Sequence, residues 1–225
     1  MNPLGQSSPA ITATHEGRFP ARPGFPGAWE ELLQTSAAWQ ELDCAKYLAT
    51  WCGHAPDHVV GRLAGVNHIG VYMGDYGGDE EIFDWHTHLN ELKTTGPVTS
   101  VEMGPSYISP RQYGTPGWWN SVTLADGRVI EMFACRRFGP WARRPAEEKG
   151  RLMSHVAIAV RTGDDVRHVL DTLESEAGHL ETIAYTEADE VGHTYGHLRN
   201  NDSGTVLEIV YEEPRDGTGH ADGRH

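Results

Sequence analysis

The stretch VNHIGVYM (residues 66–73) decides the fold, because the chain writes the same design again as MSHVAIAV (residues 153–160). Each stretch is apolar enough for a buried strand and carries a histidine near its start. Each is followed, some fifty to sixty residues later, by a hairpin whose returning strand carries a glutamate inside an apolar run. Two histidines and two glutamates therefore occupy equivalent places in two halves of one chain: His68, Glu131, His155 and Glu208.

Both halves also show the same order of elements: a strand, a helix and three further strands. In each half acidic residues follow a glycine where a helix N-terminus favours negative charge. The helices are expected at 79–92 and from 164 to about 178, and the later strands at 98–103, 118–124, 128–135, 180–186, 193–200 and 205–212. A βαβββ unit written twice is the strongest organisational signal in the sequence.

The segments outside the two units differ in composition. The first 27 residues are rich in Gly, Pro, Ser and Thr without periodicity, whereas apolar spacing from Trp29 to Thr50 predicts one amphipathic helix. The Gly- and Pro-broken stretch 104–117 is long enough to be a lid or a pocket wall. The predicted organisation is a flexible arm (1–27), an N-terminal helix and connector (28–63), module 1 (64–137), a linker (138–151), module 2 (152–213) and a disordered tail (214–225).

Composition excludes several classes of protein. A formal net charge of −14, from 18 basic and 32 acidic residues, argues against a nucleic-acid or anionic-membrane partner. The three cysteines have neither zinc-site nor redox-motif spacing, and their odd number argues against a disulfide framework. Because no signal peptide or 18-residue apolar span is visible, we expect a soluble cytoplasmic protein.

Strand geometry predicts which side chains meet, because alternate residues of a strand share a face. A four-residue turn in the second hairpin would pair His197 with Glu208. In the first hairpin, a turn around residues 126–127 would pair Val122 with Glu131. A slip of one residue would invert either assignment.

The two glutamates indicate a metal site. An unpaired carboxylate in such an apolar run is costly, so each needs a cation, a metal or the wet face of the sheet. Neutral imidazole together with carboxylate suits Zn, Ni, Co, Mn or Fe(II), and leaves two positions for water or for a substrate chelating through adjacent oxygens. Taken singly, each residue is more often capped or solvated. The occurrence of four such residues at matched positions of a repeated unit favours a metal site over four unrelated polar residues.

With these motifs in place, residues 64 to 213 resemble the vicinal oxygen chelate superfamily, which includes glyoxalase I, methylmalonyl-CoA epimerase and extradiol dioxygenases. The resemblance rests on the two histidine-bearing strands and on the endings that run from Asp126 to Glu131 and from Asp202 to Glu208. It implies an α+β, glyoxalase-like fold, in which two tandem βαβββ modules form an open, cup-shaped mixed sheet, here preceded by an N-terminal helix. It also implies four metal ligands, namely His68, Glu131, His155 and Glu208.

Three functions remain open at this point. The leading one is a metal-dependent lyase or isomerase that moves a proton through a metal-stabilised enediolate on a small substrate with vicinal oxygens. Glu131 or Glu208 would be its general base, and His197 could shuttle the proton. The alternative is an Fe(II)-dependent ring-cleaving dioxygenase with His197 as acid/base. The third is a protein that sequesters an antibiotic or another small molecule. The modules could pair within one chain or across a homodimer.

Overall fold

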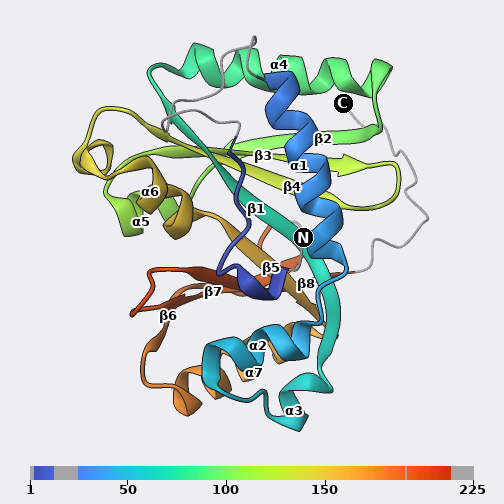
Figure 1. Ribbon diagram of the computed structural model, residues 1–225, viewed down its shortest axis with the longest axis vertical. Coiled ribbons are helices and arrows are strands. Elements are labelled where there is room, and N and C mark those ends of the chain that lie inside the picture. The colour runs from blue at the N-terminus through green and yellow to red at the C-terminus, as the bar shows by residue number, and fades with distance from the viewer. Residues whose placement is uncertain (1–2, 13–24, 191, 214–225) are drawn as a thin grey trace.

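The computed structural model describes residues 3–12, 25–190 and 192–213 (Figure 1). The predicted tail (214–225) and most of the predicted arm lie outside these residues. Within them, no helix is both long enough and apolar enough to cross a membrane.

Both βαβββ modules form as predicted. The first consists of β1 (Leu63–Tyr76), α4 (Asp79–Thr95), β2 (Val98–Pro105), β3 (Gly117–Leu124) and β4 (Val129–Arg136). The second consists of β5 (His155–Val160), α7 (Gly163–Glu176), β6 (Leu180–Thr186), β7 (His193–Asn200) and β8 (Val206–Glu212). The module boundaries 64–137 and 152–213 stay a prediction, although each module's strands lie inside them to within one residue.

The eight strands form one open, mixed sheet in the order β2-β3-β4-β1-β5-β8-β7-β6. Within each module the first and last strands are parallel neighbours, β1 with β4 and β5 with β8. The modules join through β1 and β5, which run antiparallel. The predicted glyoxalase-like fold is therefore confirmed, and the two modules pair within one chain.

The main core lies on one face of the sheet, where α1, α2, α4 and α7 pack (Figure 1). The side of β1 that faces this core carries Ile69, Val71 and Met73. The alternate positions, His68 and Gly70, lie on the other face, and the His68 side chain points there. That other face carries the candidate site.

The predicted N-terminal helix is present but divides in two, α1 (Phe25–Gln40) and α2 (Cys44–Cys52), before a single turn, α3 (Asp57–Val60). The division falls where Asp43 caps α2, since its side chain accepts a hydrogen bond from the Lys46 amide at 3.1 Å. An aspartate whose carboxylate binds backbone amides favours a helix start over a helix interior.

The stretch predicted as a linker is folded. It contains a 3-10 turn, η4 (Pro140–Arg143), and α6 (Ala146–Met153). Trp141 and Lys149 from these elements are only 1% and 3% exposed. The predicted lid (104–117) contains a further short helix, α5 (Ile108–Tyr113).

One of the two predicted hairpin registers is confirmed and the other is wrong. His197 faces Glu208 as predicted. In the first hairpin, however, Ser121 and not Val122 faces Glu131. The cause is a three-residue loop, in which the Leu124 amide bonds the Arg128 carbonyl at 2.8 Å and Gly127 adopts a φ of 86°.

Candidate metal centre

The four predicted donors lie on the four central strands of the sheet, β4, β1, β5 and β8. Each glutamate is separated from the histidine of the other module by one small residue that is the register partner of both. The two sets are Glu131–Gly70–His155 and Glu208–Ala157–His68. Because paired residues share a face, all four side chains point to the side of the sheet opposite the main core. The antiparallel seam between β1 and β5 therefore builds the site.

The donor atoms converge on one carboxylate oxygen. Glu208 Oε2 lies 3.2 Å from His68 Nε2 and 3.1 Å from His155 Nε2. Glu131 Oε2 lies 3.5 Å from His68 Nε2, and His197 Nε2 lies 3.5 Å from Glu208 Oε2. Two overlapping triads, His68/Glu131/His155 and His155/His197/Glu208, each have ligand atoms within 4.8 Å of one another. The structure thus brings together all four predicted donors and adds His197.

The two central histidines are oriented by their outer ring nitrogens. His68 Nδ1 lies 2.7 Å from Asn67 Oδ1, and His155 Nδ1 lies 3.0 Å from the Met153 carbonyl. With Nδ1 donating, each Nε2 presents a lone pair to the Glu208 oxygen, and neither buried Nε2 has a hydrogen-bond partner. A nitrogen and an oxygen lone pair that face each other at this distance need either a proton or a metal ion between them. This arrangement fits a divalent metal, since metal-binding histidines are usually oriented in this way.

The electrostatics of the cluster agree with a cationic centre. Burial would lower the pKa of His68, but the carboxylates of Glu131 and Glu208 outweigh burial and raise that pKa to about 9. Burial alone would raise the pKa of Glu208, but the imidazoles of His197 and His68 hold it well below its usual range. Without a metal the cluster therefore keeps a proton on His68 beside the Glu208 anion, and a divalent ion would compete with that proton.

Glu131 and His197 stand apart from the other three residues. The Glu131 side chain is 24% exposed, against 8% for Glu208 and 6% for His68, and burial among carboxylates raises its pKa. His197 has no partner for Nδ1, and burial lowers its pKa to about 4. Glu131 is thus the donor nearest solvent, and His197 is a buried neutral imidazole with a free ring nitrogen.

Aromatic rings border the centre, but they do not form one groove. The Phe133 ring lies 5.4 Å from the His155 ring, and Tyr195 lies 6.0 Å from His197. Trp118 packs on the main-core side, 6.0 Å from Phe83. Trp119, one residue later, points to the other face and packs with Phe133. The two neighbouring tryptophans, Trp118 and Trp119, therefore lie on opposite faces of the sheet.

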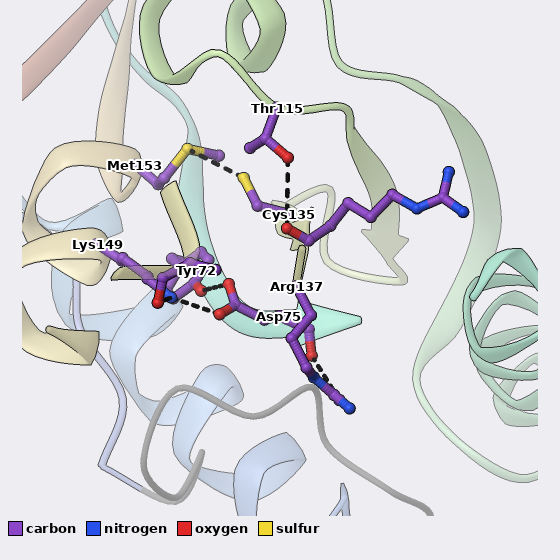
Figure 2. Close-up of polar contacts among 9 residues, drawn as sticks. Tyr72, Asp75, Thr115, Cys135, Arg137, Lys149 and Met153 are labelled. Carbon is purple, nitrogen blue, oxygen red and sulfur yellow. Dashed lines mark hydrogen bonds and ion pairs between the residues drawn. The ribbon is translucent and has the colours of Figure 1, made fainter. Parts of the chain in front are cut away.

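A second cluster of buried polar side chains, which the sequence did not predict, lies on the same face as the site (Figure 2). Lys149 of α6 forms a buried ion pair with Asp75 at the end of β1, and the Tyr72 hydroxyl donates to the same carboxylate at 2.5 Å. Trp141 packs against Tyr113 nearby, with ring centroids 4.0 Å apart. The only signal in the sequence was an acidic residue at the end of a buried strand. This cluster fixes α6 on the module 1 side of the centre.

No family model matches this chain, and no curated protein matches it. Similar solved structures include methylmalonyl-CoA epimerase from Mycobacterium tuberculosis, with 14% identity and a TM-score of 0.41 over 68% of this chain and 91% of that chain. A variant of 4-hydroxymandelate synthase from Streptomyces coelicolor shows 12% identity and a TM-score of 0.40 over 69% and 50% of the two chains. A variant of glyoxalase I from Zea mays shows 17% identity and a TM-score of 0.37 over 67% of this chain and 44% of that chain.

The epimerase and glyoxalase I are members of the superfamily that the two strand motifs resemble. At such identities and TM-scores the likeness concerns the fold alone. For this chain the fold follows from its own strand order and register, with two βαβββ modules joined by their first strands.

Proposed function

We propose that this chain is a divalent-metal-dependent enzyme of the vicinal oxygen chelate type. Its reaction would be that of a lyase or isomerase that moves a proton on a small substrate with vicinal oxygens. The observation that carries the proposal is the pair of buried, oriented Nε2 atoms of His68 and His155 that face one Glu208 oxygen. The donors come from one chain, so the proposed site needs no second subunit.

The proposed ligands are His68, Glu131, His155 and Glu208, a nitrogen and oxygen set that suits Zn, Ni, Co, Mn or Fe(II). When bound, such an ion supplies Lewis acidity, which polarises a carbonyl oxygen of the substrate and so favours loss of a proton from the neighbouring carbon.

The chain's own residues divide the remaining work. Glu131 is the proposed general base, because it is the most exposed of the four proposed ligands and yet remains buried enough for its pKa to be raised. Glu208 is surrounded by three imidazoles and remains an anion, which suits a permanent ligand. His197, whose Nδ1 has no hydrogen-bond partner, is the proposed shuttle that would take the proton from Glu131 and return it to the substrate. Phe133, beside His155, would exclude water from the reacting carbon.

Metal analysis and proton exchange test this proposal. We expect the purified protein to hold about one divalent ion per chain, and to exchange a substrate carbon-bound proton with deuterium from D₂O. Glu131→Gln should retain metal but lose exchange, whereas Glu208→Gln should lose metal. A Glu208→Gln variant that binds metal as tightly as the wild type would contradict the ligand assignment.

A ring-cleaving Fe(II) dioxygenase is the second candidate. The three shortest-range donors are His68, His155 and Glu208, and two histidines with one carboxylate are typical of non-haem Fe(II) oxygenases. Oxygen consumption by the Fe(II)-loaded protein with catechols would favour it over the isomerase. Tight binding of a small molecule by metal-free protein would favour the third function, sequestration.

A further inference from the structure

We infer that Gly70 is a positioning residue of the metal centre, because the absence of a side chain there provides the space in which the His155 imidazole lies. The inference rests on the proposed function in so far as His155 is a metal ligand. Gly70 touches no substrate or metal itself, and acts only through the ring that lies over it.

The space above Gly70 is filled by one ring. A Cβ atom at this position would lie 2.2 Å from His155 Cε1 and 2.6 Å from each of the two ring nitrogens. Cβ atoms essentially never come this close to another heavy atom. All three close atoms belong to the outer end of a rotatable side chain, and none to the backbone. A side chain at 70 would therefore displace the imidazole and leave the strand in place.

The backbone gives no other reason for a glycine here. Gly70 is not among the glycines with positive φ. It pairs with Glu131 on one side and with His155 on the other, and the register irregularities of β1 fall elsewhere. A glycine inside a regular central strand weakens that strand, and often marks a close approach by another group. At Gly70 that group is the imidazole.

Moving the ring would disable the ligand. His155 is held between the Met153 carbonyl, 3.0 Å from Nδ1, and Glu208 Oε2, 3.1 Å from Nε2. A side-chain rotation that clears a Cβ at 70 must shift both nitrogens, because both lie within contact distance of it. The ring then loses its orienting hydrogen bond and the donor atom leaves the centre.

The second module supplies a matched control. Its corresponding position is Ala157, which pairs with both His68 and Glu208. A Cβ is therefore accommodated beside His68 although none is accommodated beside His155. The repeat reads His-x-Gly in one module and His-x-Ala in the other, so Ala157→Gly tests a glycine at the equivalent strand position, where a Cβ is already accommodated.

The experiment compares Gly70→Ala and Ala157→Gly with the wild type by calorimetric titration of metal-free protein with Zn²⁺ and Co²⁺. We expect Gly70→Ala to weaken metal binding by roughly 10–100-fold, as for other changes that disturb a ligand's orientation. Its thermal unfolding and far-ultraviolet circular dichroism should match the wild type. Ala157→Gly should bind metal within a few-fold of the wild type. Equal affinity in Gly70→Ala and wild type would overturn the inference.

Two further measurements separate this inference from the proposed function. If the wild type binds no divalent ion, the proposed function fails, and crystal structures of metal-free wild type and Gly70→Ala still decide the position of the His155 ring. An unmoved ring in Gly70→Ala overturns the inference. If Gly70→Ala does not fold, the double variant Gly70→Ala/His155→Ala should fold, because the clashing ring is gone. A double variant that fails equally also overturns it.

Discussion

Asn67 is the side chain that we expect to influence metal affinity at the proposed centre most directly. Its Oδ1 lies 2.7 Å from His68 Nδ1, and so fixes which ring nitrogen faces Glu208. We expect Asn67→Ala to weaken Zn²⁺ binding by roughly 10–100-fold, because the imidazole is no longer held in one tautomer and orientation. Asn67→Asp should restore or strengthen binding, since a carboxylate raises the basicity of the ligand. Calorimetric titration measures both variants, and unchanged affinity in Asn67→Ala would contradict the orienting role.

At the residue scale, the meeting of the four proposed ligands could be predicted, whereas the groups that orient them could not. Repetition of a histidine strand and a glutamate strand located His68, Glu131, His155 and Glu208, because a duplicated unit places matched residues at matched depths in the sheet. Gly70 and the Met153 carbonyl act through space that is visible only once β1 and β5 are neighbours. A glycine and a carbonyl carry no chemical signature of their own in a sequence.

The stability of α7 depends on pH through an aspartate in its first turn. Asp165 and Thr162 form a reciprocal capping box, and Asp165 also pairs with Arg62. Burial would raise the pKa of Asp165, but the hydrogen bonds from Arg62 and Thr162 outweigh it and lower that pKa. The stabilisation is therefore complete above the ordinary value of 3.8 and is lost as the pH falls through the lowered folded-state pKa.

We expect Asp165→Asn to lower the free energy of unfolding at pH 7 by roughly 1–2 kcal/mol. The difference from the wild type should shrink as the pH falls below about 4, where the carboxylate of the unfolded chain becomes protonated. Urea denaturation at pH 7 and pH 3 measures both differences. A penalty that stays the same at the two pH values would show that charge plays no part.

The buried ion pair between Lys149 and Asp75 leads to a second prediction, which concerns how strongly α6 is held to the sheet. Removing one partner of a buried pair leaves an uncompensated charge, so Lys149→Met should cost roughly 3–5 kcal/mol of stability. The double variant Lys149→Met/Asp75→Asn should recover part of this, because the buried charge is gone and the introduced amide oxygen can still accept the Tyr72 hydroxyl. Urea denaturation of the two variants decides. A double variant less stable than Lys149→Met would contradict the argument.

Elements with a clear apolar periodicity could be predicted from the sequence. Short elements that depend on tertiary contacts could not. The eight strands and both module helices follow from apolar spacing and acidic helix starts. The short helix α6 exists because Lys149 and Met153 are buried against the sheet, which helix periodicity over so few residues does not reveal. The register error at Glu131 came from loop length, since a three-residue loop shifts every pair in the first hairpin.

At the scale of the whole molecule, the candidate site lies at the β1–β5 pairing that joins the two modules. The four proposed ligands lie on both sides of the β1–β5 seam, so a bound ion ties the modules together. Saturating metal at 100 times its Kd should stabilise the fold by about 2.7 kcal/mol. Removal by a chelator should lower the melting temperature, and should raise amide exchange in β1 and β5 more than in the outer strands β2 and β6. Uniform exchange after removal would contradict this coupling.

The sheet's near-symmetry is broken on the face of the metal centre. On the module 1 side, α5 and α6 pack beside the site, with Tyr113 and Trp141 in contact. The corresponding β6–β7 connection in module 2 spans only residues 187–192 and has no helix among its described residues. Twofold-related ligands alone would bind one substrate equally well in two orientations that differ by a rotation of 180°. Side chains packed on one flank remove that equivalence, so the substrate should bind in one orientation, and a substrate with two exchangeable positions should exchange its proton at one of them.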